Sequence, residues 1–322
     1  MTDSGRWGLT IPLAGVALLD HADIVRALPD LGYTDVWSAE TNGPDAFTPL
    51  ALTAAWEPTL RLGTAIVPVY TRGPALIAMS AAALAAAAPG RFILGLGASS
   101  PVIVGNWNGI PFEEPYRRSR DVLRAVRTAL AGQRVDGEFD SFTIKRFKLE
   151  QAPASPPPIA LAALRPQMLR LAGREADGAI LNWLASTDVP RCTAAIDNAD
   201  AEVIARIFVC PTDDVDFART MGRLLISTYL TVPAYAAFHD WLGRGEQLKP
   251  MHDAWAAGDR PGAAAAIPDD VVDALVLHGR PEACREQVEA YVEAGVQTPV
   301  MMVLPTPAGP TDLDLLRALG RS

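Results

Sequence analysis

The stretch FILGLGASSP, residues 92 to 101, nearly matches the glycine-rich turn that binds dinucleotides. That turn reads G-x-G-x-x-G, follows the first strand of its domain, and precedes by ~20 residues an acidic side chain that holds a ribose hydroxyl. Here Ser100 replaces the third glycine, and residues 117 to 120 are three arginines and a serine. We therefore expect no dinucleotide turn. Glycines at a strand end instead let a flat ring or a phosphate approach the backbone, or they serve tight packing alone.

Other polar side chains that could take part in catalysis or binding follow apolar stretches of the chain. They are Ser38, Glu40, Ser99, Ser100 and Asn182. Carboxylates at the ends of barrel strands often act as acids or bases, although a solvated loop glutamate is an equally good interpretation of Glu40. The four histidines and three cysteines are scattered, without metal-ligand spacing or a C-x-x-C pair. We predict no metal site, and the scarcity of catalytic side chains favours an organic cofactor that carries a redox step.

Eight apolar segments with turn signals would position these side chains. They are GLTIPLAG, DVWSAE, LRLGTAIVP, RFILGLGA, PPIALAAL, GAILNW, EVIARIFVC and TPVMMVLP. Helices are predicted between them, including residues 21–32, 45–56, 74–88, 116–132, 166–176 and 281–295. Several strands are apolar at consecutive positions, as strands covered on both faces are.

This alternation of strand and helix implies parallel strands joined by right-handed crossovers. Eight repeats predict an α/β fold, a (β/α)8 TIM barrel, as one domain over residues 1–322. Residues 99–116 and 229–279 exceed ordinary barrel loops. We predict that they are insertions after the fourth and seventh strands, over the catalytic face or beside it.

Composition excludes several classes of partner. A net charge of -9 provides no basic face for phosphate backbones, so we expect no nucleic-acid partner. The start, MTDSGRWGLTIPL, lacks the features of a signal peptide, and no apolar run has membrane length. We therefore expect a cytoplasmic protein with no membrane partner. Arginine far outnumbers lysine and alanine runs are frequent, which indicates a GC-rich coding sequence of actinobacterial type.

Four longer stretches resemble the bacterial-luciferase-like superfamily, and within it the branch that uses the deazaflavin coenzyme F-420. They are WSAETNGPDAF, LRLGTAIVPVYTRGPALIAMSAAAL, GRFILGLGASSPVIVGNWNGIPF and LRPQMLRLAGREADGAILNW. The string SSPVI followed by W-x-G-x-PF is fairly specific, whereas T-A-I-V-P supports the superfamily more than the branch. The resemblance implies a (β/α)8 barrel with insertions, in agreement with the strand count.

The resemblance also implies where the cofactor, coenzyme F-420 (an 8-hydroxy-5-deazaflavin), would bind. The family's third strand ends in a bulge with a non-prolyl cis peptide behind the deazaflavin ring, which corresponds to Ala65–Ile66, and Pro68 matches a ring-side position. Main chain and small side chains near the ring correspond to Gly97, Ala98, Ser99, Ala162, Ala163 and Leu164. Arg165, Pro166 and Gln167 would begin a helix whose free N–H groups and positive dipole end meet the cofactor phosphate.

The chain departs from the family pattern at positions that bear on activity. Ala39 and Glu40 replace an Asp-His pair of the family's sugar-phosphate dehydrogenases, and Ser100 replaces an acidic residue, which disfavours that activity. Asn108 stands where many close relatives have the histidine of the W-x-G motif. An amide cannot replace a proton-transferring histidine near neutral pH.

Together these features predict an oxidoreductase that transfers a hydride between the C5 carbon of the deazaflavin and an unsaturated or hydroxylated small-molecule substrate. Glu40 is the candidate proton donor or acceptor, with Asn182 and Asn42 orienting the substrate. Candidates for the substrate wall, or equally for core or dimer packing, are Trp107, Tyr229, Tyr235, Phe238 and Trp241. The alternatives are an FMN-dependent monooxygenase and a cofactor-binding barrel without turnover. The resembled family predicts a homodimer.

Overall fold

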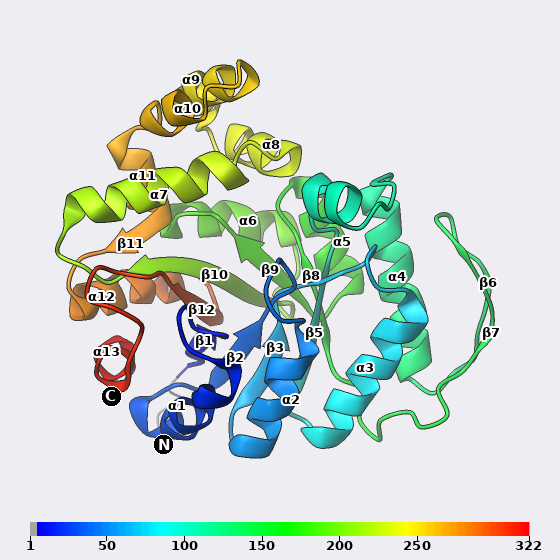
Figure 1. The fold of residues 1–322 in the computed structure, drawn as a ribbon. Helices are drawn as coiled ribbons and strands as arrows, with labels where there is room; N and C mark the ends of the chain where they lie inside the picture. Colours follow the sequence, from blue (N-terminus) through cyan, green and yellow to red (C-terminus); the bar gives the residue numbers. More distant parts are fainter. Residues whose placement is uncertain (1–4, 322) are drawn as a thin grey trace.

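Eight parallel strands close into a barrel within residues 5–321, the part of the chain that the computed structural model describes (Figure 1). In chain order they are β1 (Gly8–Thr10), β2 (Asp35–Ser38), β3 (Arg61–Thr64), β5 (Phe92–Gly97), β8 (Ile159–Ala162), β9 (Gly178–Asn182), β10 (Glu202–Cys210) and β12 (Thr298–Val303). Each pairs with the next, and β12 closes the ring on β1. Two short strands add to this sheet: β4 (Val67–Pro68) beside β5, and β11 (Val276–His278) beside β10. The predicted TIM barrel is confirmed.

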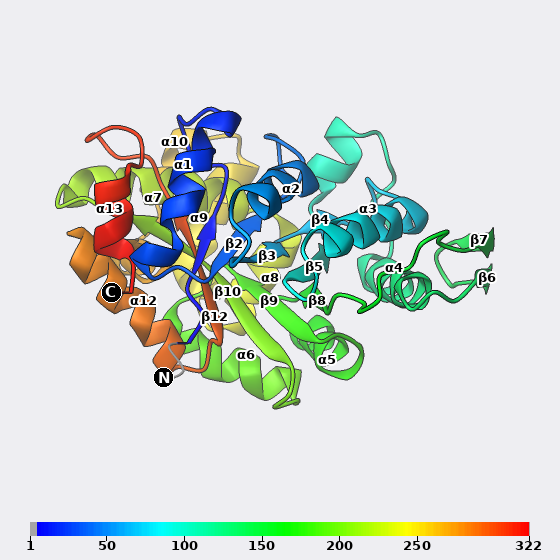
Figure 2. The same cartoon turned by 90° about the horizontal axis from the view of Figure 1, so that it is seen from below.

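Helices surround the barrel, as Figures 1 and 2 show. They are α1 (His21–Ala27), α2 (Phe47–Trp56), α3 (Pro74–Ala87), α4 (Pro115–Leu130), α5 (Pro166–Glu175), α6 (Val189–Ile196), α7 (Val215–Tyr229), α8 (Pro233–Trp241), α9 (Gly245–Ala256), α10 (Arg260–Ala265), α11 (Asp269–Leu275), α12 (Pro281–Glu293) and α13 (Leu313–Leu319). No helix of residues 5–321 is both long enough and apolar enough to span a lipid bilayer.

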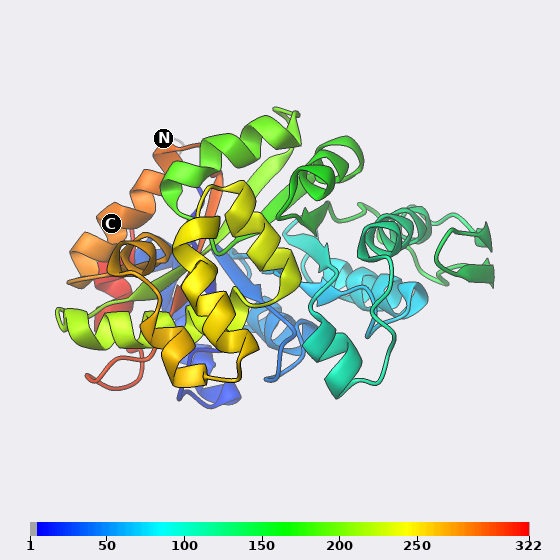
Figure 3. The same cartoon turned by 90° about the horizontal axis from the view of Figure 1, so that it is seen from above.

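The two predicted insertions are present after the fourth and seventh barrel strands, as expected. A π-helical segment, Val102–Trp107, follows β5, and helices α8 to α10 follow the seventh barrel strand, β10. Seen from above, α8 to α10 lie over the barrel, whereas the π-helical segment lies beside it (Figure 3). An antiparallel hairpin of β6 (Val135–Glu138) and β7 (Thr143–Phe147) was not predicted. It projects from the side of the barrel near α4 (Figure 2), and its short strands pair only with each other.

The barrel interior is filled around one large side chain, Trp37 of β2. It is fully buried and packs with inward residues of other strands, among them Ile93, Ile180 and Ile204. The neighbouring strands make room for it, because a Cβ added at Gly63 would lie 2.3 Å from the indole ring and one at Gly8 would lie 3.1 Å from it. Small residues opposite large ones are how a close-packed core fills its space.

A polar cluster closes the end of the barrel where the strands begin. Arg61 donates two hydrogen bonds of 2.8 Å to the carboxylate of Glu202, which also accepts one from Thr298 Oγ1. Burial alone would raise the pKa of Glu202, but the hydrogen bonds and charge of Arg61 outweigh it and lower that pKa. For the fully buried Asp35, burial dominates and raises the pKa in spite of Arg61. The cluster ties β3 to β10 across the barrel.

We expect Glu202→Gln to lower the free energy of unfolding by about 2 kcal/mol at pH 7, since it removes a paired carboxylate that is mostly buried. A lowered pKa in the folded state gives stability that is present above the unfolded value of about 4.3 and is lost as pH falls through the folded value. The difference from the wild type should therefore vanish in acid. Denaturant unfolding across pH 3 to 8 measures it, and a difference that stays constant with pH would contradict the assignment.

Candidate functional site

The chain between β3 and β4 interrupts the sheet at the carboxyl-end rim of the barrel. Pairing with β5 stops after Gly63 and resumes at Val67. Within this gap the Ala65–Ile66 peptide is cis. Thr64 bridges the gap with its hydroxyl, which donates to Gly95 O at 2.9 Å and accepts from Gly95 N at 2.7 Å. A side-chain hydroxyl thus replaces the missing ladder bonds and holds the bulge against β5.

Close packing explains both glycines of the FILGLG strand. A Cβ added at Gly95 would lie 1.8 Å from Thr64 O, and one at Gly97 would lie 2.9 Å from the Cβ of Ala162. Tight packing therefore explains both glycines, and no approach of a ligand is needed to account for them. Beyond them, Ala98 and Ser99 lie partly exposed at the rim, and Ser99 adopts the left-handed conformation with φ 66°.

The fifth barrel strand leads directly into helix α5, as predicted. Ala163 is buried, whereas Ala162 and Leu164 are partly exposed. Arg165 is the N-cap residue in extended conformation, Pro166 is the first helical residue, and no side chain caps the helix. The first helical hydrogen bond runs from Leu169 N to Arg165 O at 2.9 Å. The N–H groups of the first turn, with the exposed Arg165 beside them, are therefore available to an anion.

Glu40 follows β2 and is held in a charge pair. Its Oε1 lies 2.8 Å from both Nε and Nη2 of Arg72 and accepts from Ala46 N at 3.3 Å. The Glu40 side chain is only 15% exposed, and Arg72 also stacks over the ring of Phe47. Glu40 is therefore not a solvated loop residue. Asn42, in the next loop, is exposed and makes no side-chain hydrogen bond within residues 5–321.

Asn182 lies at the end of β9, four strands from β2 and thus on the opposite side of the barrel. Its Nδ2 donates to the hydroxyl of Tyr235 at 2.7 Å, while its Oδ1 is buried without a partner. The structure therefore does not bring Glu40, Asn42 and Asn182 into mutual contact. It does place Asn182 in register with Arg206 of β10, which the sequence analysis missed. A single arginine within the apolar run EVIARIFVC was the available signal.

The aromatic candidates separate into two groups. Tyr229 and Tyr235 contact one another beside a stack of Trp183 on Phe208, whose ring centroids are 3.9 Å apart. Phe238 is fully buried and packs on Trp241, so these two residues belong to the core beneath α8. Trp107 is 52% exposed at the end of the π-helical segment.

Two residues at which the chain departs from the family pattern hold the π-helical segment in place. Ser100 Oγ accepts from Ile103 N at 3.3 Å, before the first turn. Asn108 Nδ2 donates to Ile103 O at 2.7 Å, near the last turn. Both side chains therefore satisfy backbone groups that a short helix leaves unpaired.

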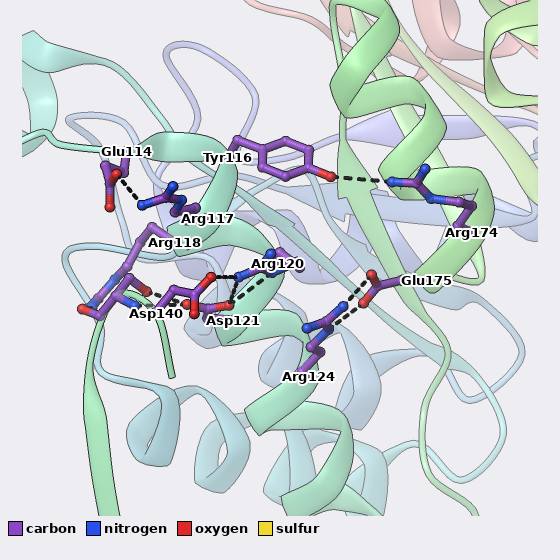
Figure 4. Close-up of polar contacts among 11 residues, drawn as sticks. Glu114, Tyr116, Arg117, Arg118, Arg120, Asp121, Arg124, Asp140, Arg174 and Glu175 are labelled. Atoms are coloured by element: carbon purple, nitrogen blue, oxygen red, sulfur yellow. Dashed lines mark hydrogen bonds and ion pairs between the residues drawn. The ribbon is translucent and has the colours of Figure 1, made fainter. Parts of the chain in front are cut away.

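The arginines on the outer side of α4 form a charge-balanced cluster (Figure 4). The pairs are Arg117 with Glu114, Arg120 with Asp121 and Asp140, and Arg124 with Glu175. Arg174 of α5 donates to the hydroxyl of Tyr116 at 3.3 Å. The cluster joins α4 to α5 and to the turn of the β6–β7 hairpin, and its cations are occupied by neighbouring acceptors.

Comparison with known proteins extends over nearly the whole chain. A family model described as luciferase-like monooxygenase matches residues 6–298. The chain is 29% identical to a putative coenzyme F-420-dependent oxidoreductase of Mycobacterium tuberculosis, covering 93% of this chain and 92% of the relative. In structure it resembles a coenzyme F-420-dependent tetrahydromethanopterin reductase from Methanopyrus kandleri, with a TM-score of 0.78, 21% identity, and coverage of 98% and 97%.

A second solved structure is an F-420-dependent secondary alcohol dehydrogenase in complex with an F-420–acetone adduct. Its TM-score is 0.73 at 15% identity, and the alignment covers 98% of this chain and 96% of the other. At these identities the two structural likenesses establish a common barrel fold.

Proposed function

Because the chain belongs to the luciferase-like monooxygenase family, we propose that it is a coenzyme F-420-dependent oxidoreductase acting on a small organic substrate. The observation that carries the proposal is the 29% identity, over 93% of this chain, to a putative oxidoreductase of that cofactor class. When bound, the deazaflavin would supply or accept a hydride at its C5 carbon. The protein would supply binding, orientation and proton transfer.

The residues present at the rim fit a ring with a phosphate tail. Ala98, Ala162 and Leu164 offer partly exposed apolar surface, which suits the face of a planar ring. The uncapped first turn of α5 offers N–H donors at the positive end of the helix dipole, and Arg165 adds a guanidinium. We therefore assign the predicted cofactor set from β3, β5 and β8 to the ring, and residues 165–167 to the phosphate.

The remaining rim residues would act on the substrate. Arg72 holds the Glu40 carboxyl group at the rim by an ion pair of 2.8 Å, and of the two open roles of Glu40 we propose proton acceptor. Asn182 would orient the substrate with its unpartnered Oδ1. Helices α8 to α10 lie over the barrel and would exclude water from the reacting atoms.

Titration of the purified protein with coenzyme F-420 and, separately, with FMN tests the proposal through cofactor fluorescence. Binding of F-420 that is at least tenfold tighter than binding of FMN is the expected result. Tight FMN binding without F-420 affinity would instead support the monooxygenase alternative that the family name carries. Oxygen uptake with reduced FMN would then identify that activity, because deazaflavin has carbon where flavin has N5 and reacts sluggishly with oxygen.

The α5 assignment predicts a selective loss of cofactor affinity in Arg165→Met. Removing one charge-assisted contact to a phosphate should weaken F-420 binding by about 1–2 kcal/mol, or roughly 5- to 30-fold. Arg170→Met is the matched control, since Arg170 lies exposed further along the same helix. The same fluorescence titration measures both variants. Equal affinities for the two would remove Arg165 from the phosphate site.

A further inference from the structure

Arg206 is a cation inside the barrel without an acidic partner. It lies two residues after the inward-facing Ile204 on β10, so its side chain points into the barrel near the rim. Its Nη2 contacts the sulfur of Met302 at 3.2 Å, and the guanidinium lies over the ring of Phe208. Its Nε is buried with no hydrogen-bond partner, and no carboxylate of residues 5–321 forms an ion pair with it. Its contacts therefore leave the charge uncompensated.

The neighbours of Arg206 complete a small set of unused polar atoms. Asn182, in register on β9, orients the Tyr235 hydroxyl through its Nδ2, while its buried Oδ1 is an acceptor that stays free for a donor group of the substrate. The hydroxyl of Tyr235 accepts from Asn182 Nδ2, so its own proton is available for donation. Tyr229 and Tyr235 are the ionisable groups that act on the guanidinium, and burial raises the pKa of Tyr235 to about 12, which keeps it a neutral donor.

An uncompensated guanidinium in this position lowers stability, since burial disfavours the charged form. Residues that lower the stability of the fold and have no structural role are typical of functional sites. The Nε edge of an arginine pairs side-on with the two oxygens of a carboxylate, and the tyrosine hydroxyl adds a third donor. The single charge of a guanidinium matches the single charge of a carboxylate, and the phosphate of the cofactor is already assigned to the α5 N-terminus.

We propose that Arg206 and Tyr235 bind a carboxylate group of the substrate, with Asn182 as the positioning residue whose Nδ2 orients the Tyr235 hydroxyl. The site lies on β9, β10 and α8, beside β8 and away from β3 and β5, the three strands that carry the assigned cofactor residues. This inference rests on the proposed function for its role in substrate selection, and it makes the α8 insertion part of the specificity site. The substrate class is accordingly a small organic acid with its reacting carbon at the cofactor and its carboxylate at Arg206.

Calorimetric titration of the full-length protein with matched acids and amides tests the site without any cofactor. The pairs are acetate with acetamide, butyrate with butyramide, and benzoate with benzamide. Wild-type protein should bind at least one acid tenfold or more tightly than its amide, or about 1.4 kcal/mol. Arg206→Met should abolish this preference, Arg206→Lys should retain part of it, and Arg170→Met should leave it intact. No preference in the wild type, or an unchanged one in Arg206→Met, overturns the proposal.

Two further measurements separate this site from other roles. Arg206→Met should unfold at the same temperature as the wild type or a few degrees higher, because an uncompensated buried charge is replaced by an apolar side chain. A marked fall would indicate a structural arginine. F-420 affinity should be unchanged in Arg206→Met, and a tenfold loss would assign Arg206 to the cofactor instead. If wild-type protein binds no F-420 but prefers the acid, the proposed function fails while the carboxylate site stands.

Discussion

Glu40→Gln should lower the rate of hydride transfer roughly 10²- to 10⁴-fold, the usual contribution of a general acid or base. Glutamine keeps the shape of the side chain and an oxygen that can accept from Arg72 and from Ala46 N, so the local geometry is preserved. The amide cannot take a proton near neutral pH. Affinity for F-420 should be unchanged, because Glu40 follows β2 and is not among the assigned cofactor residues.

Single-turnover absorbance of the cofactor, with an alcohol or ketone that the wild-type protein converts, measures this rate. Arg72→Met is the comparison that separates chemistry from positioning. It removes the ion pair but retains the carboxylate, so a catalytic Glu40 predicts a much smaller loss in Arg72→Met than in Glu40→Gln. Equal losses would make Glu40 a positioning residue. If the wild-type protein binds the cofactor but transfers no hydride to or from any alcohol or ketone tested, the alternative of a cofactor-binding barrel without turnover is favoured.

Gly95→Ala is expected to cause the largest loss of stability. A Cβ at residue 95 would lie 1.8 Å from Thr64 O and 2.5 Å from the side chain of Ile180, and the first of these atoms is backbone that cannot rotate away. The β3–β5 contact would have to separate, which would also break the two hydrogen bonds of the Thr64 hydroxyl. We expect a loss of at least 3 kcal/mol, or a fall of roughly 4–5 °C or more in the unfolding temperature of a chain of 322 residues.

Thermal unfolding followed by circular dichroism measures this loss. Gly43→Ala serves as the control, since a Cβ there meets no atom within 4 Å and the backbone conformation is an ordinary one. Gly97→Ala should fall between the two, because its added Cβ would lie 2.9 Å from the Cβ of Ala162, a side-chain atom. Unfolding temperatures that do not differ between Gly95→Ala and Gly43→Ala would refute the packing explanation of the strand.

The barrel itself could be read from the chain because its signals are local. Each predicted strand is an apolar run bounded by turn residues, and each occurs in the structure where it was predicted. Pro166 after an apolar strand likewise indicated the start of α5. The hairpin of β6 and β7 escaped because its strands are short, mostly exposed and polar, so they lack the hydrophobic pattern on which strand prediction depends.

Which side chains pair with one another at the rim depends on the closure of the barrel, which brings distant segments together. Glu40 and Arg72 are 32 residues apart, and Asn182 and Tyr235 are 53 apart, with no spacing in the chain that pairs them. Gly95 was recognisable as a special residue, yet only the path of the bulge beside Thr64 explains why it cannot carry a side chain. Arg206 was visible as one charge in an apolar strand, but whether it was paired depended on which residues of β9, β12 and α8 surround it. Periodicity and turn chemistry act over a few residues, whereas charge compensation depends on contacts between distant segments that exist only after the sheet has closed.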